Sequence, residues 1–224
     1  MNAIVATIHV IDDEATVRKA LTRLLESAGY AVRSYESAGE FLRETPRGEA
    51  GCVLLDLALP GGLDGLQAQL AFSHGHDPLP IVFLTGRGSV AASVRAMKAG
   101  AIDFLEKPVE DALLLDAVRR ALAFDAEQRT RRSRDRLLST RFASLTPRER
   151  EVFRHVVAGR LNKQIAYDIG TCERTVKAHR ARVMEKLHVR SVAELVHVAD
   201  ELEAALPVPR SPANAVPARR ELVI

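Results

Sequence analysis

The chain has 224 residues, 47% of them hydrophobic and 27% charged, with a formal net charge of +3 at pH 7. This length exceeds that of a usual single domain, and no apolar run approaches the ~18 to 20 residues of a membrane span, which excludes a membrane-spanning protein. Residues 1–8 lack the features of a signal peptide and the two cysteines suggest no disulfide framework, so we expect a soluble, cytoplasmic, two-domain protein.

Four short apolar runs in the first half of the chain predict buried parallel strands, because such strands are covered on both faces. The runs are Ile8–Ile11, Cys52–Leu55, Ile81–Leu84 and Ile102–Leu105. In a doubly wound α/β sheet, ligands bind at the carboxyl ends of the strands. Polar residues that follow these runs are therefore expected to converge on one crevice.

The polar residues after the four runs are Asp12, Asp13, Asp56, Thr85 and Lys107. Three carboxylates packed together repel one another unless a cation neutralises them, and an all-oxygen set suits Mg²⁺. Lys107 would add a positive charge for a phosphoryl group. Asp56 is then the candidate nucleophile, and its product would be an aspartyl phosphate.

Residues 4 to about 123 resemble the receiver domain of a two-component response regulator in motif and spacing. Each signal alone also fits an ordinary turn or helix cap, but all four in order favour the receiver. The resemblance implies a flavodoxin-like fold over residues 1–123, with a doubly wound, five-stranded parallel sheet. It also implies the site roles, namely Asp56 as phosphoacceptor, Asp12, Asp13, Asp56 and the Ala58 carbonyl as Mg²⁺ ligands, Thr85 and Phe104 as switch residues, and Lys107 as the phosphoryl contact.

The charge is divided unevenly along the chain. Residues 1–123 carry 12 Lys and Arg against 16 Asp and Glu, whereas residues 141–224 carry 15 against 10. Charge runs usually form solvated faces, but this asymmetry favours a polyanionic partner for the second half. Residues 124–143 are polar and Arg-rich without Gly or Pro, which predicts a helical linker. Residues 206–224 are proline-rich and aperiodic, which predicts a disordered tail.

Residues 144–205 are expected to form a small all-α domain of four helices. Thr146 and Glu149 complete a capping box around Pro147 at the first helical position. Asn162 is expected to cap a short second helix, which Gly170 ends. The expected helices cover residues 147–157, 162–169, 173–187 and 192–202.

A short helix, a Gly-containing turn and a basic helix form the pattern of a helix-turn-helix, whose second helix enters the DNA major groove. Val176, Val183 and Leu187 fall on one inward stripe of the basic helix, so its cations point outward. The same charges would also suit a solvated face of a small bundle, but the motif favours DNA. The candidate DNA-binding residues are Asn162, Lys163, Arg174, Thr175, Lys177, Ala178, Arg180, Ala181, Arg182 and Arg190.

Residues 144 to 200 resemble the LuxR-type helix-turn-helix that ends the NarL/FixJ subgroup of response regulators, in the stretches TPREREV, NKQIA, ERTVKAHR and EKL. The FixJ-like branch is most similar. The resemblance implies a transcriptional regulator and not an enzyme. Its implied partners are a sensor histidine kinase, double-stranded DNA with paired half-sites, RNA polymerase and, once phosphorylated, a second copy of the chain.

Two departures from the family pattern lie in the helix-turn-helix. Cys172 stands where the family usually has Ser, and Leu161 precedes Asn162 where a small or turn-forming residue is common. Cys is a poor N-cap, so Thr171 or Thr175 is expected to compensate. An exposed thiol also raises the hypothesis of redox-sensitive DNA binding, although a merely tolerated Cys is the simpler interpretation.

Two other function classes remain open at this point. One is an atypical regulator that binds DNA without control by phosphate, and the complete set of receiver residues weighs against it. The other is a Mg²⁺-dependent phosphotransfer enzyme with a helical appendage, and the sequence shows neither a substrate pocket motif nor a second catalytic base for it.

Overall fold

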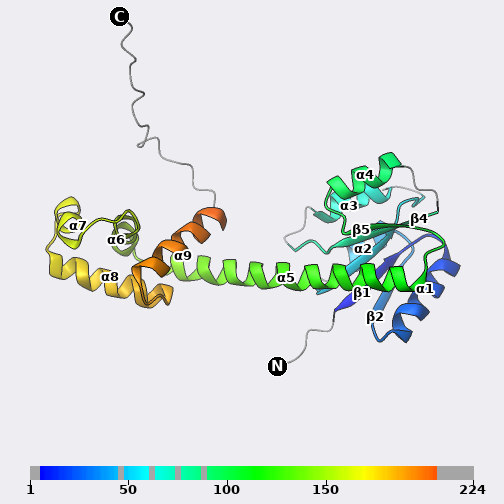
Figure 1. Ribbon diagram of the computed structural model, residues 1–224, viewed down its shortest axis with the longest axis horizontal. Coiled ribbons are helices and arrows are strands. Elements are labelled where there is room, and N and C mark those ends of the chain that lie inside the picture. The colour runs from blue at the N-terminus through cyan, green and yellow to red at the C-terminus, as the bar shows by residue number, and fades with distance from the viewer. Residues whose placement is uncertain (1–5, 45–47, 61–63, 74–76, 87–89, 206–224) are drawn as a thin grey trace, which may run out of the picture. The chain divides into compact units, whose positions relative to one another are not determined.

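The computed structural model describes residues 6–44, 48–60, 64–73, 77–86 and 90–205 (Figure 1). The chain divides into two compact units, residues 1–130 and 131–224. The tail 206–224, for which disorder is expected, lies outside the described residues. Among the described helices, none combines the length and apolarity needed to cross a membrane.

The first unit contains a five-stranded parallel sheet, as the resemblance implied. Its strand order is β2-β1-β3-β4-β5. All residues of β1, β3 and β4 are buried, which explains their apolar sequences. The edge strand β2 is largely exposed and has no such apolar run. The strands are β1 (Thr7–Ile11), β2 (Ala31–Tyr35), β3 (Gly51–Asp56), β4 (Ile81–Thr85) and β5 (Asp103–Glu106).

Helices cover both faces of this sheet (Figure 1). Because side chains alternate across a strand, the neighbours Leu54 and Leu55 of β3 enter opposite cores. Leu54 packs in a core with residues of α1 (Ala15–Ser27) and α5 (Asp111–Ala143). Leu55 packs in the core on the other face, whose helices are α2 (Ala38–Glu44), α3 (Gly65–Ser73) and α4 (Val90–Lys98).

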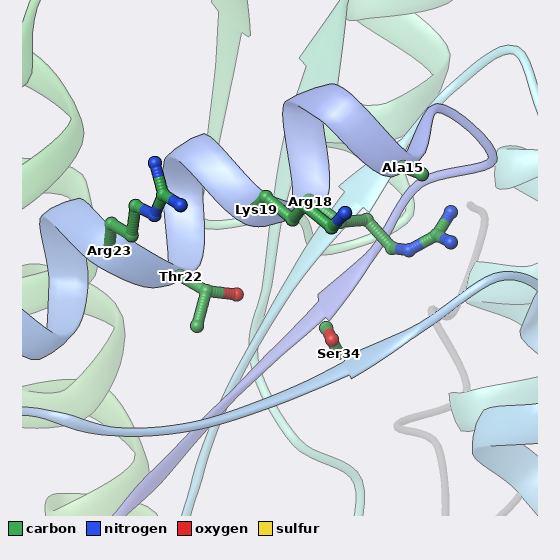
Figure 2. A pocket seen from close by; sticks show the side chains of 6 residues that line it. All are labelled: Ala15, Arg18, Lys19, Thr22, Arg23 and Ser34. Atoms are coloured by element: carbon green, nitrogen blue, oxygen red, sulfur yellow. The ribbon is translucent and has the colours of Figure 1, made fainter.

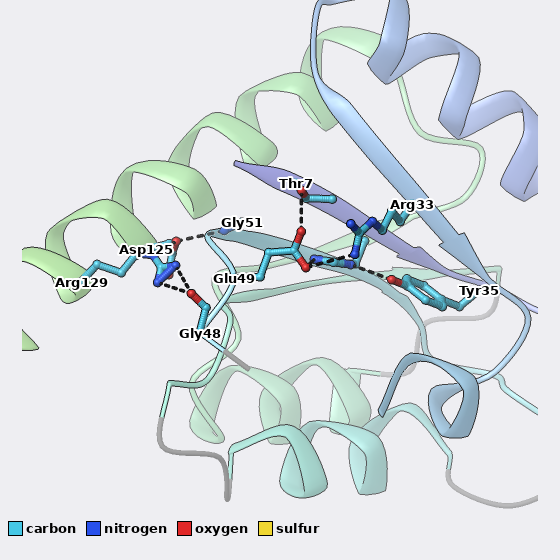
Figure 3. Close-up of polar contacts among 9 residues, drawn as sticks. Thr7, Arg33, Tyr35, Gly48, Glu49, Gly51, Asp125 and Arg129 are labelled. Carbon is cyan, nitrogen blue, oxygen red and sulfur yellow. Dashed lines mark hydrogen bonds and ion pairs between the residues drawn. The ribbon is translucent and has the colours of Figure 1, made fainter. Parts of the chain in front are cut away.

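Helix α5 runs without interruption from Asp111 to Ala143, so the segment 124–143 is helical. Two side chains near the start of this segment are held by the first unit (Figure 3). Asp125 Oδ2 accepts a hydrogen bond from the Gly51 N–H at 3.0 Å, and Arg129 donates to the Gly48 carbonyl at 2.6 and 2.9 Å. The first compact unit therefore includes residues 124–130 of α5.

Up to residue 205, where the described part of the chain ends, the second unit contains the C-terminal part of α5 and four further helices. The expected capping box is present, because the Thr146 hydroxyl accepts from the Glu149 N–H at 3.3 Å and Glu149 Oε2 accepts from the Thr146 N–H at 2.9 Å. A buried core joins all four helices, with contributions from Val152, Ile165, Val183 and Leu195. The helices are α6 (Pro147–Val157), α7 (Asn162–Asp168), α8 (Glu173–Leu187) and α9 (Val192–Ala205).

The start of α7 differs from our expectation. Leu161 occupies the N-cap position, and Asn162 is the first helical residue. The Gln164 side chain accepts a hydrogen bond from the Leu161 N–H at 2.9 Å, while Asn162 Oδ1 accepts one from Arg180 of α8 at 3.0 Å. The prediction of Asn162 as the cap was therefore wrong, because its side chain is committed to a contact between helices.

Candidate functional sites

Three carboxylates meet at the carboxyl ends of β1 and β3. One oxygen each of Asp12, Asp13 and Asp56 lies within 4.8 Å of the others. Asp12 and Asp56 are almost fully buried, at 1% and 4% exposure, and Asp13 is half-buried. Backbone N–H groups orient two of them, since Asp12 Oδ1 accepts from Glu14 at 2.9 Å and Asp56 Oδ1 accepts from Ala58 at 3.1 Å. This is a donor set that can hold a divalent metal ion.

Lys107 supplies the positive charge of this cluster. Its Nζ lies 2.5 Å from Asp12 Oδ2 and 2.9 Å from Asp56 Oδ2. Burial by itself lowers the pKa of the Lys107 ammonium, but the hydrogen bonds and charges of Asp12 and Asp56 outweigh burial and raise the pKa above its ordinary value. Lys107 is therefore charged at neutral pH and partly neutralises the buried carboxylates.

Thr85 and Phe104 lie on the two strands beside this cluster. Thr85 ends β4 and is 1% exposed, and its carbonyl accepts a hydrogen bond from the Lys107 N–H at 2.7 Å. Phe104 of β5 is half-buried, with its ring 6.1 Å from that of Phe83. Ala58 is exposed at the start of the loop after β3. All the receiver residues that the sequence singled out thus lie at or next to one end of the sheet.

Two further residues shape the acidic cluster. Arg18 of α1 donates to the backbone carbonyls of Asp12 and Asp13 at 2.6 and 2.9 Å. Gly65 allows α3 to start against β3, because a Cβ atom there would lie 2.7 Å from the Asp56 carbonyl oxygen. Sequence reasoning missed both residues, and only the tertiary contact, not a motif, identifies Arg18.

A second polar cluster surrounds His9 within β1, and Figure 3 labels its members Arg33, Tyr35 and Glu49. His9 is completely buried, its Nδ1 lies 3.2 Å from the Tyr35 hydroxyl, and its Nε2 lies 4.0 Å from the Glu49 carboxylate. Burial lowers the pKa of His9 to about 4, against a smaller opposing effect of Glu49 and a reinforcing one of Arg33. The imidazole is therefore neutral at physiological pH, and sequence reasoning had not marked it.

Helix α8 presents a basic face opposite its buried stripe. Val176, Val183 and Leu187 are buried, as the helical wheel predicted. The small residues Ala178 and Ala181 are exposed among cations. The exposed cations among the candidates are Lys163, Arg174, Lys177, Arg182 and Arg190. These groups are accessible to phosphates and base edges in the way that a groove-binding helix requires.

Three other DNA-binding candidates are less accessible. Asn162 and Arg180 are half-buried and hydrogen-bonded to each other, so this pair ties α7 to α8. Thr175 is half-buried, with its hydroxyl 3.3 Å from the Cys172 Sγ. These side chains would have to exchange or share their present partners in order to contact DNA.

Cys172 is the N-cap residue of α8 and makes no side-chain capping hydrogen bond. The Thr175 hydroxyl pairs with the thiol, so it does not replace the missing cap. The contact with the Thr175 hydroxyl is the main cause that lowers the pKa of the exposed Cys172 thiol. The backbone N–H groups of the first turn of α8 therefore have fewer capping partners than those of α6.

Comparison with known protein families gives two matches that together cover most of the chain. The family described as "Response regulator receiver domain" matches residues 8–119. The family described as "Bacterial regulatory proteins, luxR family" matches residues 143–199. The first match contains the carboxylate cluster, and the second contains the basic face of α8.

Individual relatives match along nearly the whole chain. Nodulation protein W of Bradyrhizobium diazoefficiens is 40% identical, over 88% of this chain and 86% of its own. Transcriptional regulatory protein FixJ of Azorhizobium caulinodans is 42% identical, over 86% and 90%. Among solved structures, the response regulator StyR has a TM-score of 0.79 and 43% identity, and the match covers 88% of this chain and 98% of StyR.

Proposed function

This chain belongs to the family of response-regulator transcription factors that join a receiver domain to a LuxR-type DNA-binding domain, and from this premise we propose that phosphorylation of Asp56 controls its binding to promoters. The observation that carries the proposal is the position of the Asp56 carboxylate, beside two other aspartates and 2.9 Å from the Lys107 ammonium. The phosphoryl donor is a phosphohistidine of a sensor kinase in the same, cytoplasmic compartment.

In the transfer step, one carboxylate oxygen of Asp56 attacks phosphorus. The new bond joins that oxygen to phosphorus, and the bond between phosphorus and the donor's imidazole nitrogen breaks, so the electron pair leaves with the histidine. Lys107 contacts the transferred phosphoryl oxygens, which requires its ammonium to turn from Asp56 towards them. Asp12 Oδ2, which lies 2.5 Å from the Lys107 Nζ in this structure, offers Lys107 a second anionic contact.

The donor set fits Mg²⁺, because all of its side-chain atoms are oxygens and two of the three carboxylates are buried. We assign Asp12, Asp13, Asp56 and the Ala58 carbonyl as the residues that would hold it. When bound, Mg²⁺ supplies positive charge that offsets the repulsion between these carboxylates and the incoming phosphoryl oxygens. The Asp12 and Asp13 carbonyls are held in place by Arg18, which keeps this loop fixed.

The response to phosphorylation is assigned to Thr85 and Phe104. The Thr85 hydroxyl moves towards the phosphoryl group, and Phe104 packs inward behind it. The surface around α4 and α5 then changes shape and pairs with the same surface of a second copy. This surface carries a set of exposed apolar side chains that suits such pairing, namely Val90, Val94, Met97 and Leu113.

Pairing strengthens DNA binding because two modest half-site affinities combine into one event. We assign Lys177, Ala178 and Ala181 to base edges, since small residues let the helix backbone approach them. The groups assigned to phosphates or to the borders of the contact are Asn162, Lys163, Arg174, Thr175, Arg180, Arg182 and Arg190. The promoter-bound dimer then acts on RNA polymerase.

The transfer step is tested with the purified full chain, acetyl phosphate and Mg²⁺. We expect one phosphoryl group per chain by intact mass, which hydroxylamine removes because it cleaves acyl phosphates. Asp56→Asn should abolish this addition, whereas the matched variant Asp116→Asn, at an exposed carboxylate of α5, should leave it unchanged. Equal phosphorylation of Asp56→Asn would contradict the assignment of the nucleophile.

A further inference from the structure

A basic pocket lies between α1 and the edge strand β2 (Figure 2). Its volume is about 320 Å³. Arg18, Lys19, Thr22 and Arg23 line it from α1, and Ser34 lines it from β2. Ala15 completes the lining, so the walls carry three cations and two hydroxyls and no carboxylate. Neither the receiver motif nor the DNA-binding face includes these residues, although Arg18 also contacts the backbone carbonyls of Asp12 and Asp13.

Two of the three cations are uncompensated. Within the ranges that the structure describes, the side chains of Lys19 and Arg23 make no ion pair or hydrogen bond. They lie four residues apart on one helix, where like charges destabilise the helix. The acids near the helix ends, Glu14 and Glu26, form no ion pair with them. The helix thus carries an unfavourable charge arrangement that an anion would relieve.

The charge of the pocket also contrasts with that of its surroundings. Residues 1–123 carry an excess of Asp and Glu over Lys and Arg, so a cluster of three cations is unusual in this half of the chain. The hydroxyls of Thr22 and Ser34 add hydrogen-bond donors, which suit an oxyanion as the ligand. Guanidinium groups such as those of Arg18 and Arg23 hold oxyanions by paired hydrogen bonds, which a lone lysine cannot do.

We propose that this pocket binds a small polyanion, of the class that carries two neighbouring phosphoryl groups. The volume of the pocket falls in the range of small-molecule sites, about 300 to 1,000 Å³, which favours a small ligand over the flat surface of a macromolecule. Lys19 and Arg23 bind the ligand with their free charges. Arg18 already donates to the carbonyls of Asp12 and Asp13, so it contributes only its remaining N–H groups.

The test is isothermal titration of the full chain with pyrophosphate in Mg²⁺-free, resin-treated buffer at low salt, so that no metal bridges the ligand to the carboxylates. We expect a dissociation constant below about 1 mM. The double variant Lys19→Gln/Arg23→Gln should weaken binding at least about tenfold, because two charged hydrogen-bond donors are lost. Amide NMR signals of Thr22 and Ser34 should shift on titration.

The matched control is Arg95→Gln/Lys98→Gln, which removes two exposed cations from α4 outside the pocket. It should leave the dissociation constant within about twofold. Asp56→Asn should also retain binding, which separates this pocket from the proposed phosphorylation site. Absence of binding, equal weakening by both double variants, or loss of binding in Asp56→Asn would each overturn the proposal.

Discussion

The carboxylate cluster of the first unit and the basic face of α8 both concentrate charge, but they do so in opposite environments. Asp12 and Asp56 are almost fully buried, and each lies within 3 Å of the Lys107 ammonium. Lys177 and Arg182 are exposed on α8. A buried charge needs its partner, whereas an exposed charge is compensated by water and salt. We therefore expect changes in the first site to affect folding and function together, and changes on α8 to affect binding alone.

The largest effect is expected for Lys107→Met without Mg²⁺. This variant leaves Asp12 and Asp56 buried without their cation, and loss of one partner of a buried ion pair costs about 3 to 5 kcal/mol. Hydrogen–deuterium exchange of β1 and β3 peptides measures the loss. Mg²⁺ should restore part of the protection, because it neutralises the same carboxylates. Lys98→Met at an exposed site is the control, and equal exchange in both variants would refute the buried-charge account.

The buried His9 makes the stability of the first unit depend on pH. Its pKa is 6.5 unfolded and about 4 when folded, so the folded state binds the proton less readily. The contribution of His9 to the free energy of unfolding is therefore fully present above pH 6.5. It is lost as the pH falls towards 4, and the loss amounts to roughly 3 kcal/mol. Urea unfolding between pH 7 and pH 4 measures this. In His9→Phe, the unfolding free energy of the first unit should depend less steeply on pH in this window. An unchanged pH dependence would contradict the assignment of this effect to His9.

Glu149 gives the second unit a buried charge of its own. Its carboxylate accepts from Lys186 at 2.7 Å and from the Thr146 N–H at 2.9 Å, and these hydrogen bonds lower its pKa. Its stabilising effect is present above the ordinary glutamate pKa of about 4.3 and is lost as the pH falls through the lowered folded pKa. Glu149→Gln should cost about 2 kcal/mol at pH 7, as measured by exchange of α6 peptides. If Glu149→Gln were as stable as the wild type, the stabilising role of this carboxylate would be contradicted.

Arg182→Gln probes the exposed side of the comparison. Its effect on the unfolding free energy should stay within about 0.5 kcal/mol, because the side chain is exposed. Affinity for a selected DNA site should fall about tenfold. The negative slope of log affinity against log salt concentration should become shallower by about 1, because one phosphate contact is lost. Fluorescence anisotropy over a salt series gives both values. An unchanged slope would remove Arg182 from the phosphate contacts.

The smallest effect is expected for Cys172→Ser. Ser is a better N-cap than Cys, so α8 should become slightly more stable and more protected from exchange. DNA binding before and after mild oxidation should be the same in both proteins if the thiol is merely tolerated. An oxidant response that disappears with the serine would instead support the redox hypothesis.

The elements that sequence predicted well are those with a strong local pattern. Helices α6 and α8 have the predicted bounds, because a capping box and an apolar stripe mark them. The convergence of Asp12, Asp56 and Lys107 followed from the geometry of parallel strands. The edge strand β2 gave no comparable signal, since most of its side chains are exposed.

Contacts that depend on tertiary placement could not be predicted from the sequence. His9 sits in an apolar strand, and its partners Tyr35 and Glu49 come from distant segments. Arg18 approaches the Asp12 carbonyl only because α1 packs in one orientation on the sheet. Asn162 has the side chain of a typical cap, but the hydrogen bond from Arg180 holds it within the helix instead.

The central claim is that the phosphorylation state of Asp56 sets the affinity for DNA. We would select sites from a random-sequence pool with the purified chain, then measure binding with and without acetyl phosphate and Mg²⁺, alongside Asp56→Asn. The account predicts that the phosphodonor tightens binding to a site with two half-sites and that the variant does not respond. Equal binding under all three conditions would contradict the switch and leave only a DNA-binding protein.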